Sequence, residues 1–205
     1  MQSIQRLQAY IDHFFPLQPD EWRALKTLMR PMRLPKGSAI FPESETADAL
    51  YFVAEGIVRA YRIDERGDDY TWAFHCLDTG HLERRMLLDA IAVDYASFTR
   101  GTPQELAFET LCDTLLYRVD KSDILQLYAS AKRWQTFARY LAEEAYATLQ
   151  ERAFEFQSKR AKERLLMLKQ VFPALFEKRV PTVHIASYLG IRRQSFNRLR
   201  RELGL

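Results

Sequence analysis

The chain has 205 residues, of which 47% are hydrophobic and 13% aromatic, enough for one large or two small folded domains. Charges interrupt every apolar stretch, which excludes a membrane span, and the N-terminus has no basic segment followed by an apolar one, which excludes a secretory signal. Two cysteines, Cys76 and Cys112, are too few for an iron–sulfur cluster or a four-thiolate zinc site. We therefore expect a cytoplasmic protein with reduced thiols, no metal and no membrane contact.

The charge of the chain is divided unevenly along its length. Residues 158–205 hold twelve Lys or Arg and three Asp or Glu, whereas the preceding part is mildly acidic, and the whole chain has a net charge of +3. A basic module at one end indicates a polyanionic partner for that module alone. A basic, solvated surface is the alternative explanation.

Within the first 119 residues, the residue pattern changes once, from helical spacing to short β-type runs. Residues 1–30 have apolar side chains at helical spacing, and Pro31 and Pro35 end that pattern. From Leu34 to about Val119, glycines and acidic turns separate short β-branched and aromatic runs. We predict strands at 34–41, 49–63 and 70–77, and around 105–119, with a hairpin-type turn at Glu55-Gly56 and a second turn at Cys112-Asp113. This pattern is typical of a β-roll, jelly roll or barrel.

One segment within the strands has a different period. Residues 81–93 (HLERRMLLDAIAV) place Leu82, Met86 and Ala90 four residues apart, with Leu87 and Ile91 beside them. The spacing predicts a short helix inserted between strands.

A long helix is predicted from about Lys132 to Phe156, after a helix start at Asp120 or Ser122. Two neighbouring apolar stripes widen its apolar face, so that one stripe can pack on the β-domain and the other on a second copy. The residues that we assign to a dimer helix are Phe137, Leu141, Ala145 and Leu149, beside a second stripe that includes Ala142, Tyr146 and Ala153. A packing helix within a single chain is the alternative.

The C-terminal segment follows a helix-turn-helix pattern. A short helix begins near Thr182, Gly190 supplies the positive φ of the turn, and Ile191 inserts into the core. In helical projection, Phe196, Leu199 and Leu203 of the next helix form one narrow inward stripe. The opposite side carries amide and guanidinium groups, which bind adenine and guanine edges respectively. The residues that we predict to contact DNA are Arg192, Arg193, Gln194, Asn197, Arg198 and Arg201; a solvated basic helix is the alternative.

The order of a β-roll, a long helix and a terminal helix-turn-helix resembles the Crp/Fnr family of bacterial transcription regulators. The resemblance is carried by LPKGSAIFPESETADALYFVAEGIVRAYRIDERGDDYTWAF in the first half, and by SKRAKERLLML and HIASYLGIRRQSFNRLRREL in the second. It implies an α+β chain with a β-roll sensor domain over 1–130, a dimerisation helix over 131–157 and a DNA-binding domain over 158–205. This last domain is similar to that of the family's short-tailed branch.

The same resemblance implies a homodimer that binds a near-palindromic operator on double-stranded DNA, and it suggests RNA polymerase as a further partner. By position, Arg193, Gln194 and Arg198 match the family's base-reading residues. Asn197 and Arg201 are added by the projection, and Arg192 is a weaker candidate for a phosphate contact.

The family's cyclic-nucleotide cassette is degraded in this sequence. Its best match places Asp94 at the ribose-binding Glu and Gln104 where a phosphate-binding Arg is expected, and the neighbouring Glu105 would repel a phosphate. We therefore do not expect cyclic AMP or cyclic GMP as effector, and another small effector or none remains open. Candidate effector-pocket residues are Asp94, Tyr95, Ser97, Arg100 and Gln104.

No enzyme motif occurs: the sequence contains no phosphate loop, nucleophile elbow or H-E-x-x-H pair. We expect no catalytic activity. The alternative to a regulator is a module that senses a small molecule or binds a protein and carries a vestigial helix-turn-helix. The degraded cassette and the lack of a wing hairpin after Leu205 motivate this alternative.

Overall fold

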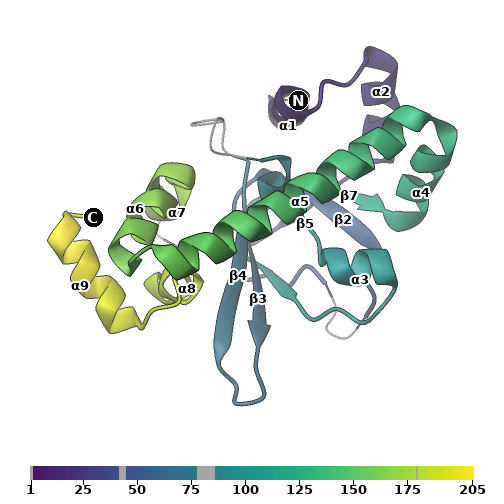
Figure 1. The fold of residues 1–205 in the computed structure, drawn as a ribbon. Coiled ribbons are helices and arrows are strands. Elements are labelled where there is room, and N and C mark those ends of the chain that lie inside the picture. The colour runs from purple at the N-terminus through teal and green to yellow at the C-terminus, as the bar shows by residue number, and fades with distance from the viewer. Residues whose placement is uncertain (1, 42–44, 78–85, 179) are drawn as a thin grey trace.

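The computed structural model describes residues 2–41, 45–77, 86–178 and 180–205. Two antiparallel sheets form a roll, one in the order β1-β7-β2-β5 and the other in the order β4-β3-β6. Helices flank the roll, so the predicted α+β class with a jelly-roll-like domain is confirmed (Figure 1). The strands are β1 (Arg30–Leu34), β2 (Ala49–Glu55), β3 (Val58–Ile63), β4 (Asp69–His75), β5 (Ile91–Ala92), β6 (Ala107–Thr110) and β7 (Thr114–Asp120).

The predicted turn at Glu55-Gly56 is not a hairpin, because β2 and β3 belong to different sheets. The turn at Cys112-Asp113 likewise leads from β6 in one sheet to β7 in the other. The two corners touch: Gly56 has φ +92°, and a Cβ atom there would lie 2.3 Å from the hydroxyl of Thr114. Both turns therefore connect one sheet to the other, and β3 and β4 form a hairpin across residues 64–68.

The N-terminal helical region and the first strand differ in detail from the prediction. The helical region is split into α1 (Gln2–Phe14) and α2 (Pro19–Leu28), with Pro19 at the start of the second helix. Strand β1 begins at Arg30 and includes Pro31. A proline is tolerated there because β1 is an edge strand, in which a missing backbone N–H is acceptable. The predicted strand at 34–41 is reduced to an isolated bridge between Ala39 and Glu109.

The helix predicted over 81–93 is wrong where the structure describes it, and residues 81–85 lie outside the described residues. Residues Leu87–Ala90 form a single 3₁₀ turn, and Ile91–Ala92 form β5, which pairs with Tyr51 and Phe52 of β2. The pairing of Ile91 and Ala92 with β2 requires extended backbone there, so the helical turn ends at Ala90.

Helix α5 runs past the roll and leads to the C-terminal helices α6–α9 (Figure 1). It covers Lys132–Ser158, so the predicted helix is confirmed and extends two residues further. The remaining helices are α3 (Tyr95–Arg100), α4 (Lys121–Ser130), α6 (Ala161–Val171), α7 (Ala174–Glu177), α8 (Thr182–Tyr188) and α9 (Arg193–Leu203).

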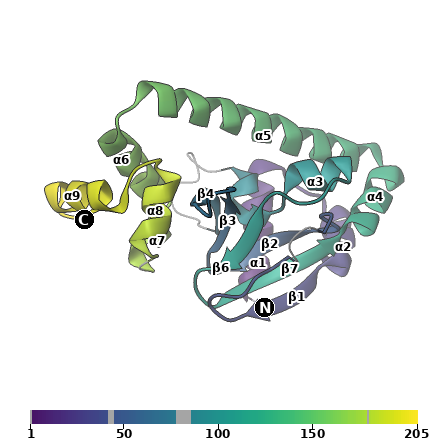
Figure 2. The ribbon, with the colours of Figure 1, turned by 90° about the horizontal axis from the view of Figure 1, so that it is seen from below.

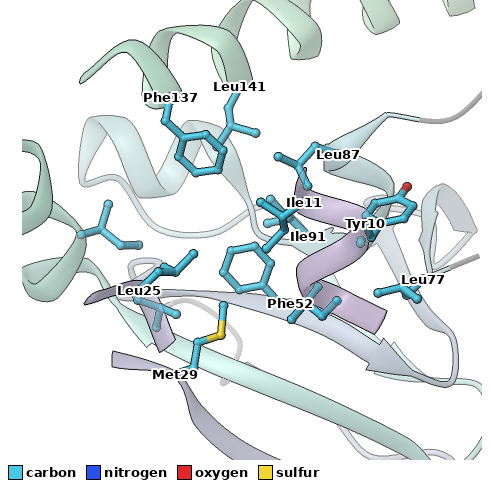
Figure 3. Close-up of a cluster of buried hydrophobic side chains, with 14 of the residues drawn as sticks. Tyr10, Ile11, Leu25, Met29, Phe52, Leu77, Leu87, Ile91, Phe137 and Leu141 are labelled. Carbon is cyan, nitrogen blue, oxygen red and sulfur yellow. The ribbon is translucent and has the colours of Figure 1, made fainter. Parts of the chain in front are cut away.

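One hydrophobic core lies between α1, α2, the first sheet and the first half of α5. Phe137 and Leu141 extend from α5 toward Ile11 of α1 and Phe52 of β2 (Figure 3). Burial of such side chains contributes about 2 kcal/mol each. Two of the four residues assigned to a dimer helix are therefore used within the chain and are not available to a second copy.

A second core joins the C-terminal helices to the roll. It combines residues of α6, α8 and α9, such as Leu165, Ile185 and Phe196, with Ile57 and Phe74 of the roll. Figure 2 shows α8 beside β4, whereas α9 extends away from the sheets. The roll thus holds the C-terminal helices through α8 and leaves α9 at the far end.

Candidate DNA-binding face and effector site

Helices α8 and α9 are joined by a tight turn at Gly190. The N–H of Gly190 donates to the carbonyl of Ser187 (2.9 Å), and the N–H of Ile191 donates to the carbonyl of Ala186 (3.0 Å). This double closure with a left-handed residue is the Schellman arrangement, and Gly190 has φ +65°. A Cβ atom at Gly190 would lie 3.0 Å from the ring of Phe156, so the turn also packs closely on α5.

Helix α9 is divided into two faces as the projection predicts. Phe196 is fully buried, and Leu199 and Leu203 pack against the same core. All six residues predicted to contact DNA are exposed: Arg192, Arg193, Gln194, Asn197, Arg198 and Arg201. We call these six the reading face.

The reading face carries few internal contacts that fix its side chains. Arg198 lies 3.8 Å from Glu202 one turn along the helix, and Arg201 donates weakly to the carbonyl of Asn197 (3.4 Å). Arg200, by contrast, is half-buried and donates to the carbonyl of Leu205 (3.2 Å), so it stabilises the helix end. The face therefore presents guanidinium and amide donors to solvent on a rigid helix.

Polar contacts that the sequence motifs do not predict dock α8 on the roll. The hydroxyl of Ser187 accepts from the N–H of Thr71 and donates to the carbonyl of Asp69, both in β4. His184 lies 4.0 Å from the carboxylate of Glu109, which also pairs with Arg59 (2.7 Å). Burial, together with the nearby Arg59 charge, holds the pKa of His184 below its usual value. An arginine within the apolar run IVRAY was the only sequence signal for this contact.

Arg59 is the polar centre of that docking contact. Its side chain is only 1% exposed, and it hydrogen-bonds Thr71 (2.9 Å) and pairs with Asp69 as well as Glu109. Burial lowers its pKa, although the bond to Glu109 opposes this effect. A buried cation of this kind stabilises a fold only while its partners remain in place.

The candidate effector residues cluster around α3, but their polar atoms serve the fold. Asp94 is buried and accepts three backbone N–H bonds, from Ser97 (3.1 Å), Glu105 (2.9 Å) and Leu106 (3.2 Å). The hydroxyl of Ser97 accepts from the N–H of Ala47 and donates to the carbonyl of Thr102. Asp94 therefore fixes the loop after α3 and has little capacity left for a ribose hydroxyl.

The other three candidate effector residues do not form a common site with Asp94 and Ser97. Tyr95 and Arg100 are exposed at opposite ends of α3, whereas Gln104 is half-buried and its amide oxygen has no hydrogen-bond partner among the described residues. Inside the roll, the rings of Phe41, Tyr51 and Phe108 are in contact, with centroids 4.8 and 4.9 Å apart. These rings occupy the space between the two sheets.

Helix α5 keeps a second apolar stripe that its own chain does not cover. Tyr146 is 69% exposed and Leu149 is 47% exposed, and they lie on the same side as Ala142 and Ala153. Of the residues assigned to a dimer helix, Ala145 is half-buried and Leu149 belongs to this exposed stripe.

The described residues contain neither a cluster suited to a metal ion nor a helix suited to cross a membrane. Among the described ranges, no group of three or more His, Cys, Asp or Glu side chains is arranged to hold a metal ion. No helix within those ranges combines the length and apolarity needed to cross a membrane.

Comparison with known proteins places these features in a family context. Residues 31–131 match the family model of the cyclic nucleotide-binding domain. The chain is similar in fold to FixK2 from Bradyrhizobium japonicum, with TM-score 0.68 and 19% identity, over 86% of this chain and 84% of that one. It is also similar to the catabolite activator protein of Thermus thermophilus (TM-score 0.51, 22% identity, 93% and 85% covered).

The sensor domain of the transcriptional regulator DNR from Pseudomonas aeruginosa is a third similar structure, with TM-score 0.55, 18% identity, and 76% and 96% covered. A search among curated proteins gives no match. Residues 31–131 therefore match the cyclic nucleotide-binding domain family, and the chain as a whole is similar in fold to FixK2 and to catabolite activator protein.

Proposed function

We propose that this chain is a sequence-specific DNA-binding transcription regulator that acts as a homodimer on a near-palindromic operator. The observation that carries the proposal is the reading face of α9. Gln194, Asn197, Arg198 and Arg201 are exposed on the side of α9 opposite the buried Phe196. Arg192 and Arg193 are exposed where this helix begins, and the helix extends away from the sheets (Figure 2). Two of the proteins that are similar in fold to this chain support the same function. DNR is a transcriptional regulator, and the Thermus thermophilus protein is a catabolite activator.

The geometry suits insertion of α9 into a major groove. Arg193, Gln194, Asn197 and Arg198 are the residues that would reach base edges, because they lie in the first half of the helix. Arg binds guanine, and Asn or Gln binds adenine, through two hydrogen bonds each. Arg192 and Arg201 would contact phosphates, which position the helix without specifying sequence.

Selection of binding sites from genomic fragments, followed by gel-shift titration, tests the proposal. We expect Arg193→Ala and Arg198→Ala each to weaken binding to the selected site by about 1–3 kcal/mol, and the affinity to fall steeply with salt. Arg23→Ala is the matched control, because Arg23 is an exposed arginine on α2, far along the chain from α9. Equal binding by the two α9 variants and the parent would remove the basis of the proposal.

The homodimer would form through the exposed stripe of α5. Tyr146 and Leu149 are large apolar side chains in solvent on a helix whose other side is already packed. A second copy would bury them, and the two α9 helices would then face successive major grooves. Phe137 and Leu141 are not part of this interface, because they lie in the chain's own core.

We do not expect cyclic AMP or cyclic GMP to be the effector. Asp94 and Ser97 are occupied by bonds to the backbone, Arg100 is exposed at the far end of α3, and Phe41, Tyr51 and Phe108 occupy the roll. A ligand at about 100 times its dissociation constant would stabilise the fold by about 2.7 kcal/mol. A thermal-shift titration with both cyclic nucleotides should therefore show no saturable change, and a saturable shift would contradict this part of the proposal.

A further inference from the structure

Asn197 is the only asparagine in the 205-residue chain, and it lies in the middle of α9. Asparagine is a poor helix former, because its short amide competes for the hydrogen bonds of the backbone. Where an asparagine stabilises a fold, it most often caps the start of a helix or occupies a turn, where its amide satisfies a free backbone group. The position of Asn197 therefore requires an explanation other than helix formation.

Within the described part of the chain, no contact supplies this explanation. The side chain of Asn197 is exposed and forms no hydrogen bond with the described residues; only its backbone carbonyl accepts, from Nε of Arg201 (3.4 Å). The end of α9 is closed by Gly204, which has φ +64° and donates to the carbonyls of Arg200 and Arg201, so the amide is not needed there. A residue that breaks a local rule without a gain for the fold is expected at a functional site.

Gln194 places a second exposed amide on the same side of α9. It precedes Asn197 by three residues, and side chains at this spacing are neighbours on the surface of a helix. The side chain of Gln194 also has no hydrogen-bond partner among the described residues. Phe196 and Leu199 pack into the core from the other side of the helix, so both amides are presented to solvent.

The chemistry of the two amides fits adenine better than any other base. An amide offers a donor and an acceptor side by side, which match N7 and the N6 amino group of adenine in the major groove. Guanine presents two acceptors there, and cytosine presents a donor that suits a carboxylate. Glu202 is the only acid within α9, and it lies in the last turn, 3.8 Å from Arg198.

We infer that Asn197 and Gln194 each bind an adenine, so that every operator half-site presents two adenines to α9. Each side-chain NH₂ would donate to N7, and each side-chain oxygen would accept from N6. The two residues are separated by about 4.5 Å along the helix axis, and successive bases by about 3.4 Å, so the two adenines lie in nearby base pairs. The inference rests on the proposed function, because it requires α9 in a major groove.

Binding-site selection followed by gel-shift titration tests the inference with two nearly isosteric variants. Replacement of either adenine of the selected half-site should weaken the parent at least about fivefold. Asn197→Asp and Gln194→Glu offer acceptors only, which suit the amino group of cytosine, so each variant should select cytosine in place of one adenine and keep the other positions. Gln5→Glu, at an exposed position of α1, introduces the same charge and should keep both adenines.

A third variant distinguishes base reading from a role in the fold. Asn197→Ala should raise the melting temperature or leave it unchanged, because alanine is the better helix former, while the preference for adenine disappears at one position. A lower melting temperature together with an unchanged base preference would show that Asn197 serves the fold, and would overturn the inference.

The selection also separates this inference from the proposed function. A change from adenine to cytosine at one position in each acidic variant supports both. A parent site without two adenines in each half, or an unchanged preference for adenine in both acidic variants, contradicts the inference and leaves the proposed function in place. A parent that binds no DNA contradicts both.

Discussion

The hydroxyl of Ser187 completes the outer edge of strand β4 at Thr71. It accepts from the N–H of Thr71 (2.8 Å) and donates to the carbonyl of Asp69 (3.0 Å). Because β4 is an edge strand of its sheet, these two backbone groups have no strand partner on that side. A single side chain of α8 therefore takes the place of a neighbouring strand and fixes α8, and with it α9, on the roll.

We predict that Ser187→Ala loosens this docking. The change leaves the N–H of Thr71 and the carbonyl of Asp69 without their partner and should reduce the free energy of unfolding by about 1–2 kcal/mol. Urea denaturation measures the loss, and hydrogen exchange at Thr71 locates it. Ser158→Ala serves as a control, since the hydroxyl of Ser158 bonds only within its own helix. Unaltered exchange at Thr71 would mean that the contact does not hold α8.

Replacement of two arginines of β3 by alanine should reduce the free energy of unfolding by different amounts. Arg59 is 1% exposed and pairs with Glu109, whereas Arg62 is 61% exposed and pairs with Glu105. Arg59→Ala removes the buried cation that Glu109 and Asp69 share and leaves its space empty, so it should cost about 3–5 kcal/mol, while Arg62→Ala should cost no more than about 1 kcal/mol. Urea unfolding of both variants checks the difference, and similar losses would show that burial does not decide the strength of these pairs.

Stability should fall with decreasing pH because of His184. Its pKa in the folded chain lies below the ordinary value of about 6.5, since burial and Arg59 disfavour its charged form more than Glu109 favours it. Below about pH 6.5 the unfolded chain therefore binds a proton that the folded chain resists, and stability decreases until the folded pKa is passed. Unfolding near pH 7.5 and near pH 5.5 should show a smaller difference for His184→Gln than for the parent. The same difference in both proteins would exclude His184 as a source of the pH dependence of stability.

The exposed stripe of α5 should determine the oligomeric state. A charge at Leu149 would have to be buried if a second copy covers this stripe, so Leu149→Glu should weaken the dimer at least about a hundredfold. Sedimentation velocity measures the dissociation constant, and Gln150→Glu, at the next exposed position, is the control. A parent that is monomeric at every concentration would contradict the dimer.

Gly56 should tolerate substitution less well than Gly67, although both have positive φ. A Cβ at Gly56 would meet the backbone of Asp113 at 2.8 Å, whereas nothing lies within 4 Å of one at Gly67. Gly56→Ala should therefore cost at least about 2 kcal/mol more than Gly67→Ala, which carries the backbone strain alone. Thermal unfolding of the two variants measures the difference, and equal losses would show that the two sheet corners do not touch in solution.

The helical projection of the last residues was sufficient to divide α9 into its buried and exposed faces. Phe196 points into the core and Arg193 and Arg198 point to solvent because a period of 3.6 residues is a local property of the backbone. Gly190 could be placed in the turn for a similar reason, since positive φ favours glycine wherever it occurs. The β texture of 34–119 also follows from local residue preferences.

The partners of these elements could not be predicted from local pattern. Gly56 looks like a hairpin turn, but it is a corner between two sheets, because its environment is set by Thr114, which is distant in sequence. Asp94 looks like a ligand-binding acid, but it accepts backbone N–H groups from a loop that only the fold brings to it.

The sequence by itself determined the long helix α5, the β character of most of residues 34–119 and which side of α9 is polar, because these properties depend on neighbouring residues. Only the tertiary structure decided that Phe137 and Leu141 are buried while Leu149 stays exposed, and that Ser187 fixes α8 on β4. These outcomes depend on contacts between residues far apart in the chain, whose geometry no local period encodes.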